Sequence, residues 1–305
     1  MSHIANISIG VSIIVPTRNR RAELAHCLRS LTRLAYEPFE VIVVDDASSY
    51  AVAALVAGLF DRRVRVIRSE TRLGKSRARN LGVRQAAHGL VAFIDDDCTA
   101  DRLWLSRLGE PFTDPNVGFV IGETQYVRDD HRGRFPERVV QNLWAQWPSA
   151  GNLAYRKSTF EALGGFNEDF DRFNNEDTEL GMRALARGVA YARQPDARVY
   201  HQATQWTARS LLASAKNVAV FVPLVVRYPR TVNAFGRRVW FGRFVQPLDY
   251  LLIAVSPVLV PLLAIRFWRH GQRNWLVFFA KWPAWFVLRR IFVWIEAVRQ
   301  RRFML

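Results

Sequence analysis

Short apolar runs alternate with helix-like stretches through the first third of the chain, and this alternation constrains the fold most strongly. Each run is almost continuous in Val, Ile, Leu and Phe, as expected of strands covered on both faces. Such strands, separated by helices, predict an α/β fold with a mostly parallel, Rossmann-like sheet. The apolar runs are Val11–Val15, Phe39–Val44, Val64–Ile67 and Leu90–Ile94, and the helix-like stretches between them are Arg20–Thr32, Ala51–Phe60 and Ser76–Ala87.

Polar clusters follow three of these predicted strands. They are Pro16-Thr17-Arg18-Asn19, Asp45-Asp46-Ala47-Ser48 and the triplet Asp95-Asp96-Asp97. In open α/β sheets, ligands bind beyond the carboxyl ends of the strands. The three clusters are therefore expected to meet at one edge of the sheet and to form a binding site there.

The acidic triplet is predicted to hold a divalent cation. Burying unpaired carboxylates costs several kcal/mol, so three of them directly after a strand are not core residues. Carboxylate oxygens bind Mg²⁺ or Mn²⁺, and such a cation neutralises phosphate groups. A second acidic pair, Glu176-Asp177, begins a helix-like stretch about eighty residues later and offers a candidate base. Together they indicate group transfer from a phosphate-activated donor.

Two other clusters carry alternative readings. Asp46 is expected to accept hydrogen bonds from a base or ribose, although Asp45 to Ser48 could instead cap the next helix. Lys75, Arg77 and Arg79 lie at a helix start, where the helix dipole disfavours cations and favours an anionic ligand. The alternative for these three is a solvated basic face.

The C-terminal region differs in composition from the rest of the chain. Residues 227–305 hold 14 of the 43 Lys and Arg residues and two acids, so most of the net charge of +16 lies there. Two apolar stretches, Val245–Ile265 and Trp275–Ile295, lie within this basic region. Basic, Trp-rich apolar segments favour a membrane surface. The first is long enough to span a bilayer, and the second, which contains charges, suits an interfacial helix.

An amphipathic helical pair packed on protein is the alternative for this tail. Nucleic-acid binding is not expected, because the charge is confined to an apolar region. Two cysteines favour a reducing compartment, and no signal peptide is expected. Thr207–Arg227 has apolar positions at helical spacing and predicts a packed helix leading to the tail.

The ordered motifs resemble family 2 glycosyltransferases of the GT-A fold. The resemblance rests on residues 11–19, Asp45-Asp46 with Ser48, residues 74–80 and the triplet. It continues in Ala150–Arg156, in Gly164-Gly165-Phe166-Asn167-Glu168, and in the acidic pair within Asn175–Arg183. It covers about residues 8–205.

The resemblance implies a nucleotide-diphosphate sugar donor, Mg²⁺ or Mn²⁺, and inversion at the anomeric carbon. Asp177, with Glu176 beside it, would be the general base. Asp95, Asp97 and His201 would be metal ligands. Donor binding would fall to Pro16, Thr17, Arg18, Asp46, Lys75, Arg77, Arg79, Asp95 and Asp96.

Processive synthases of this family carry a Gln-x-x-Arg-Trp motif, and Gln205-Trp206 lacks its spacing and arginine. We therefore expect non-processive transfer of a single sugar. Because the tail would hold the active site near the membrane surface, we expect the acceptor to be a lipid-linked or envelope glycan. The expected domains are residues 1–230, catalytic, and 231–305, a membrane-associated helical tail at the cytoplasmic face. A nucleotidyltransferase, a non-catalytic nucleotide-sugar scaffold and a membrane structural protein are the alternatives.

Overall fold

The fold is described from a computed structural model of the 305-residue chain, covering all residues except 1–8, 128–136, 139, 203, 237 and 270–278. The described residues form two compact units. The first comprises 9–127, 140–171 and 176–202, and the second comprises 137–138, 172–175 and the chain after 203. The expected domain boundary at residue 230 stays a prediction.

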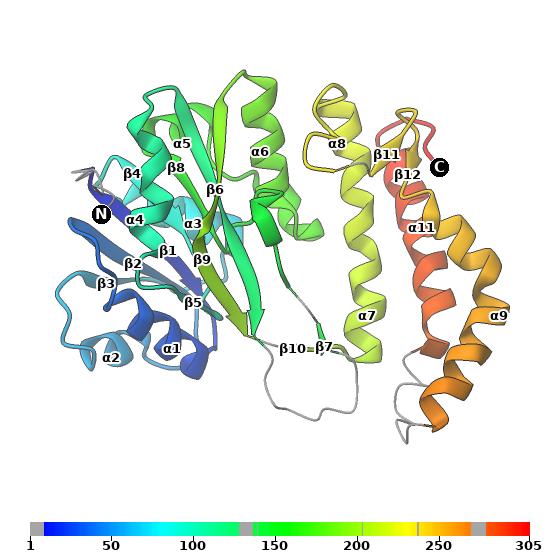
Figure 1. Cartoon of the computed structure of the whole chain (residues 1–305), viewed down its shortest axis with the longest axis horizontal. Helices are drawn as coiled ribbons and strands as arrows, with labels where there is room; N and C mark the ends of the chain where they lie inside the picture. Colours follow the sequence, from blue (N-terminus) through cyan, green and yellow to red (C-terminus); the bar gives the residue numbers. More distant parts are fainter. Residues whose placement is uncertain (1–8, 128–136, 139, 203, 237, 270–278) are drawn as a thin grey trace. The chain divides into compact units, whose positions relative to one another are not determined.

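An eight-stranded sheet organises the first unit (Figure 1). Its strand order is β3-β2-β1-β4-β8-β6-β9-β5. The first four of these strands pair in parallel, as the sequence predicts, while β8 is antiparallel to both β4 and β6, and β5 is antiparallel to β9. The strands are β1 (Val11–Thr17), β2 (Phe39–Asp46), β3 (Val64–Ser69), β4 (Leu90–Phe93), β5 (Cys98–Ala100), β6 (Val117–Val127), β8 (Leu153–Arg156) and β9 (Ala190–Gln202).

Side chains of a strand alternate between the two faces of the sheet, so an apolar strand places apolar side chains on both faces. Helices cover both of these faces. Ile13 and Val15 pack with buried residues of α1, α2 and α4, whereas Ile14 faces Gly82 of α3. The helices of this unit are α1 (Arg21–Leu31), α2 (Val52–Ala57), α3 (Lys75–Arg84), α4 (Trp104–Gly109), α5 (Lys157–Leu163) and α6 (Glu176–Ala186).

Gly82 shows how tightly α3 approaches the sheet. A Cβ atom at this position would lie 2.5 Å from Cγ2 of Ile14 and 3.2 Å from Cγ2 of Val44. No side chain fits there without displacing β1 or β2. The start of α3 is therefore held close to the carboxyl ends of these strands.

The second unit is mainly helical. Its elements are β7 (Glu137–Arg138), β10 (Thr204–Gln205), α7 (Ala208–Ser214), α8 (Phe221–Arg227), β11 (Val239–Trp240), β12 (Phe244–Val245), α9 (Leu248–Arg269) and α11 (Trp282–Arg299). The packed helix expected over Thr207–Arg227 is found as α7 and α8, joined by a 3₁₀ turn. The part of the expected stretch Trp275–Ile295 that precedes Phe279 lies outside the described residues.

Ion pairs join the two tail helices to each other. Asp249, at the start of α9, accepts from Arg289 Nε at 2.7 Å and from Arg290 Nη2 at 2.6 Å, both on α11. Two of the charges within the second apolar stretch, Arg289 and Arg290, are thus paired with a protein carboxylate. Ala208–Arg227 and Leu248–Arg266 are both long and apolar enough to cross a bilayer, but half of the first is buried in protein and only 11% of the second.

Candidate active site

The polar clusters meet at the carboxyl edge of the sheet, as expected. Thr17 of β1 lies opposite Asp45 of β2, and Ile14 of β1 lies opposite Phe93 of β4. The cluster after β1 therefore lies between the other two. The strand register alone brings together residues 16–19, 45–48 and 95–97.

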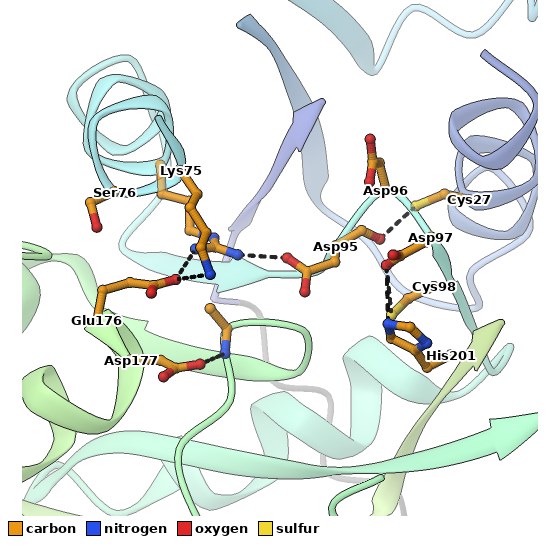
Figure 2. Close-up of polar contacts among 12 residues, drawn as sticks. Cys27, Lys75, Ser76, Asp95, Asp96, Asp97, Cys98, Glu176, Asp177 and His201 are labelled. Carbon is orange, nitrogen blue, oxygen red and sulfur yellow. Dashed lines mark hydrogen bonds and ion pairs between the residues drawn. The ribbon is translucent and has the colours of Figure 1, made fainter. Parts of the chain in front are cut away.

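The three carboxylates of the triplet point in different directions (Figure 2). Asp95 Oδ1 accepts from Arg79 Nη2 at 2.6 Å. Asp96 accepts from Thr17 Oγ1 at 2.7 Å and from Arg20 Nη1 at 3.1 Å. Asp97 pairs with the same Arg20 nitrogen at 2.5 Å and lies 3.4 Å from His201 Nε2.

The buried middle carboxylate is held by neighbouring protein groups. Burial raises the pKa of Asp96 to about 6, although Thr17 and Arg20 favour its ionised form. Its partners come from the end of β1 and from the residue before α1. The hydrogen bond between Asp96 and Thr17 anchors the triplet to β1.

Strand pairing brings His201 to the triplet. Cys98 of β5 is the register partner of His201 in β9, so the imidazole lies beside Asp97. His201 Nδ1 is 2.8 Å from the carbonyl oxygen of Gln202. When Nδ1 carries the proton and donates it to this carbonyl, Nε2 keeps a free lone pair toward Asp97.

Asp97 and His201 fit the cation that the sequence predicts. Ligand atoms of Asp97, Cys98 and His201 all lie within 4.8 Å of one another. A carboxylate oxygen and an imidazole nitrogen suit Mn²⁺ or Mg²⁺, whereas a thiol suits softer metals. Burial also raises the pKa of the Cys98 thiol well above its ordinary value, so Asp97 and His201 are the groups of this cluster that suit the predicted cation. Asp95, which is paired with Arg79, stays a predicted ligand.

Arg79 joins the two acidic motifs. Its guanidinium is almost fully buried and binds Asp95 at 2.6 Å and Glu176 Oε1 at 2.7 Å. Burial lowers the pKa of Arg79, but Asp95 and Glu176 outweigh this, so the net pKa is raised and the charge is retained. Lys75 Nζ adds a second cation, 3.3 Å from the same Glu176 oxygen.

Asp177 lies at the start of α6, and both of its carboxylate oxygens accept backbone hydrogen bonds. Its Oδ2 accepts the backbone amide of Ala150 at 3.0 Å, and its Oδ1 accepts that of Thr178 at 2.7 Å. Burial, followed by the neighbouring Glu176, raises the pKa of Asp177 to about 6. Its carboxylate is therefore both ionised at neutral pH and more basic than an ordinary aspartate.

The start of α3 is occupied by a carboxylate of the protein itself. Asp171 accepts from the amide and hydroxyl of Ser76. Gly74, at φ +85°, precedes the helix, and a Cβ there would lie 2.8 Å from Asp171 Oδ2. Asp46 accepts from the amides of Leu73 and Gly74, which fixes this turn in the described conformation.

The remaining predicted donor-binding residues differ in exposure. Arg77 is exposed and pairs with Glu168 at 2.5 Å. Arg18 is exposed, Pro16 is partly exposed, and among the described residues Arg18 has no hydrogen-bond or ion-pair partner. Arg18 is thus the cation of the predicted set with the most freedom to meet a ligand.

Two residues that contact the candidate site were missed by sequence reasoning, namely Arg20 and Asp171. Arg20 follows the cluster after β1 by one residue, so its place beside that cluster was the available signal. Asp171 contacts Ser76 across 95 residues of sequence, and no local pattern indicates such a pairing.

An exposed tryptophan lies in the loop that carries the Ala150 amide. Trp144 is 68% exposed and adopts φ +60°, and Ala145 follows at φ +50°. The buried carboxylate of Glu123 accepts the Trp144 amide at 2.9 Å. Positive φ is unusual for a bulky residue, so this turn holds the indole outward at some conformational cost.

Comparison with known proteins identifies the relatives of the chain. An uncharacterised protein of Mycobacterium tuberculosis is 28% identical over 68% of this chain and 72% of its own length. The pre-mycofactocin glycosyltransferase of the same species is 28% identical over 72% of this chain, and chondroitin synthase of Pasteurella multocida is 27% identical over 65%. The chain spans 48% and 25% of those two proteins.

Solved structures agree in fold. A mannosyltransferase from Pyrobaculum calidifontis, in complex with GDP-Man and Mn²⁺, has a TM-score of 0.63 at 18% identity, covering 93% of this chain and 86% of that one. Residues 1–349 of Staphylococcus aureus TarS, in complex with UDP-GlcNAc, have a TM-score of 0.57 at 17% identity, and the match covers 96% of this chain and 93% of that fragment. The family described as glycosyl transferase family 2 matches residues 12–187. With this match over more than half of its length and its GT-A type of sheet, the chain belongs to the family 2 glycosyl transferases.

Proposed function

We propose that the protein is a metal-dependent, inverting glycosyltransferase. It transfers a single sugar from a nucleotide-diphosphate sugar to a hydroxyl of a lipid-linked or envelope glycan. The observation that carries this proposal is Asp177, whose carboxylate is held by the Ala150 amide and whose pKa lies near 6. A carboxylate in this state accepts a proton from an attacking hydroxyl at neutral pH.

Donor binding is proposed for the edge of the sheet. Asp97 and His201 would hold Mn²⁺ or Mg²⁺, and the bound metal would stabilise the negative charge of the departing diphosphate. Lys75 would approach the diphosphate, and Arg18, exposed after β1, would approach the nucleotide. The GDP-Man and Mn²⁺ of the mannosyltransferase neighbour and the UDP-GlcNAc of TarS support a nucleotide-sugar donor.

Inversion is supported by the different environments of the two acids of α6. Glu176 is buried and bound to Arg79 and Lys75, so it is poorly suited to attack a sugar carbon. Asp177 would then act alone as the base, and the acceptor oxygen would attack the face opposite the leaving diphosphate. A single displacement of this kind inverts the anomeric configuration. Glu176 acts by fixing the start of α6.

Membrane association is proposed for the tail. Along α9, the exposed side chains recur every three or four residues and form one apolar stripe. The stripe consists of Leu248, Leu251, Val255, Val258, Leu262 and Ile265. Together with the basic composition of residues 227–305, it suits the cytoplasmic surface of an anionic membrane.

The first experiment is a donor screen with the purified full chain. UDP-, GDP-, dTDP- and CDP-sugars are incubated with Mn²⁺, Mg²⁺ or EDTA, and nucleotide release is measured. We expect release from one donor class, lost with EDTA and with Asp177→Asn. Asp169→Asn, which changes an exposed acid shortly before α6, is the matched control and should retain activity.

A folded, metal-supplemented protein that binds a nucleotide sugar but neither hydrolyses nor transfers it would contradict this proposal. It would favour the non-catalytic scaffold instead. Release of pyrophosphate from a nucleoside triphosphate and a sugar phosphate would favour a nucleotidyltransferase.

A further inference from the structure

The four residues before the acidic pair belong to a different unit from their neighbours in sequence. Asp171 and Glu176 are both in the first unit, whereas residues 172–175 pack in the second. The chain thus leaves the first unit after Asp171 and returns to it at Glu176. Asp177, the proposed base, follows that return point by one residue.

Both ends of this excursion are fixed in the first unit. Asp171 accepts from the Ser76 amide at 3.2 Å, and Glu176 binds Arg79 at 2.7 Å. Because residues 172–175 directly precede α6, their conformation affects the position of its first turn. Because both ends are held, a displacement of residues 172–175 is transmitted to the first turn of α6.

The middle of the excursion is held by α11 of the tail. Arg172 Nη2 donates to Glu296 Oε1 at 2.9 Å, and the Arg172 guanidinium lies 4.3 Å from the centre of the Phe173 ring. Asn175 Nδ2 donates to the Phe173 carbonyl at 2.7 Å. Asn174 adopts φ +53°, a conformation that persists where the surroundings impose it.

Glu296 is an unusual residue for the buried side of a tail helix. Its side chain is 3% exposed, and a carboxylate so placed is costly unless it is partnered. Besides Arg172, it accepts from Gln300 Nε2 at 3.0 Å and lies 3.6 Å from Arg299. Arg299 and Gln300 lie at the C-terminal end of α11, close to Glu296 in sequence. Among the described residues, Arg172 is therefore the one partner of Glu296 that comes from another part of the chain.

We propose that Glu296, acting through Arg172, is a positioning residue for Asp177. The ion pair holds residues 172–175 in the conformation from which α6 begins, and α6 presents the base. This inference rests on the proposed function of Asp177 and adds a second role for the tail. The tail then supports catalysis through a defined contact, in addition to any association with lipid.

The test compares Arg172→Gln, Glu296→Gln and Arg172→Lys with wild type. Arg172 is 47% exposed on its side chain, so its substitution leaves the core intact even if Glu296→Gln folds poorly. We expect kcat for nucleotide release to fall about 10-fold in both Gln variants, because small misplacements of a catalytic group cost rate rather than donor affinity. The KM for the donor should stay within about twofold.

Two further variants separate positioning from general stability. Arg172→Lys retains the single charged contact to Glu296 and should recover most of the lost kcat. Arg299→Gln removes a cation of the same helix that lies farther from Glu296, and should behave as wild type. A parallel fall in kcat, donor affinity and melting temperature, without recovery by lysine, would overturn the proposal.

Hydrogen exchange provides a readout that does not depend on activity. Amides of residues 172–180 should exchange faster in Arg172→Gln than in wild type or Arg299→Gln, while those of β1 and β4 stay unchanged. Unchanged exchange at 172–180 would overturn the inference even in an inactive protein. Absence of nucleotide release from wild type, by contrast, would overturn only the proposed function.

Discussion

Apolar side chains serve opposite purposes in the two units. In β1, Ile13, Ile14 and Val15 are fully buried, whereas along α9 Leu251, Val258 and Leu262 expose 57%, 67% and 59% of their surface. The site in the first unit instead depends on a few individual polar contacts, made by Arg79 and Asp177. The site should therefore respond sharply to changes of one atom, whereas the tail should respond gradually to changes in area.

The largest effect is expected from a nearly isosteric change in the site. Asp177→Asn removes the proton acceptor while keeping the shape of the side chain. Transfer should fall by about 10²- to 10⁴-fold, the usual contribution of a general base. Steady-state rates with the donor found in the screen would measure it. Near wild-type transfer by this variant would remove the proposed mechanism, and liposome binding should be unchanged.

Arg79→Met tests whether one buried cation holds the site together. It leaves the buried carboxylate of Glu176 with Lys75 as its remaining ionic partner, and should lower the free energy of unfolding by about 3–5 kcal/mol. Urea denaturation measures this. Arg77→Met, at an exposed ion pair, is the control and should change the free energy by less than about 1 kcal/mol. Equal effects of the two substitutions would break the contrast between buried and surface charges.

The tail is tested by removing part of the apolar stripe. Replacing Leu251, Val258 and Leu262 together by Ser should weaken binding to anionic liposomes by about 100-fold, at about 1 kcal/mol for each half-exposed side chain. Val258→Ser alone should weaken it several-fold. A sedimentation assay measures both. Loss of all binding by the single substitution would show that the tail also depends on one contact.

A smaller effect is expected from pH. Asp177 must be ionised to accept a proton, and burial raises its pKa to about 6. As the pH falls below 6, kcat/KM should therefore decrease about 10-fold per unit, and above 6 it should level off. The residual activity of Asp177→Asn should not show this decrease of kcat/KM below pH 6. If kcat/KM of the wild type began to fall only near pH 4, the base would not be in this buried environment.

The strands and their polar ends were predictable because both rest on local patterns. Continuous Val and Ile runs marked β1 to β4, and the parallel arrangement then required the clusters at 16–19, 45–48 and 95–97 to meet. The resemblance implied a strand within Ala150–Arg156, where β8 lies, but the antiparallel direction of β8 inside the sheet was not predicted. Its pairing with β4 and β6 depends on contacts between segments distant in sequence.

The partners of the site residues were harder to predict than their location. Arg79 lies in the predicted basic cluster, but its binding to both Asp95 and Glu176 depends on how α3 packs against the sheet. Asp171 lacked a local pattern of its own, whereas Arg20 directly follows the cluster at 16–19. The roles of Asp46, Arg77 and the other predicted donor-binding residues stay predictions. Asp46 and Arg77 each have protein partners that a donor would have to replace or join.

The chain has two cysteines, and both lie beneath the triplet. Cys27 Sγ is 3.7 Å from the Asp95 carbonyl oxygen, and Cys98 Sγ is 3.9 Å from the Asp97 carboxylate. Burial raises the pKa of both thiols well above the ordinary value, so neither reacts readily in the closed fold. Their alkylation rate consequently reports how often this edge of the sheet opens. Opening of the site can therefore be followed by alkylation and mass spectrometry at the two native cysteines, without introducing a residue for the purpose.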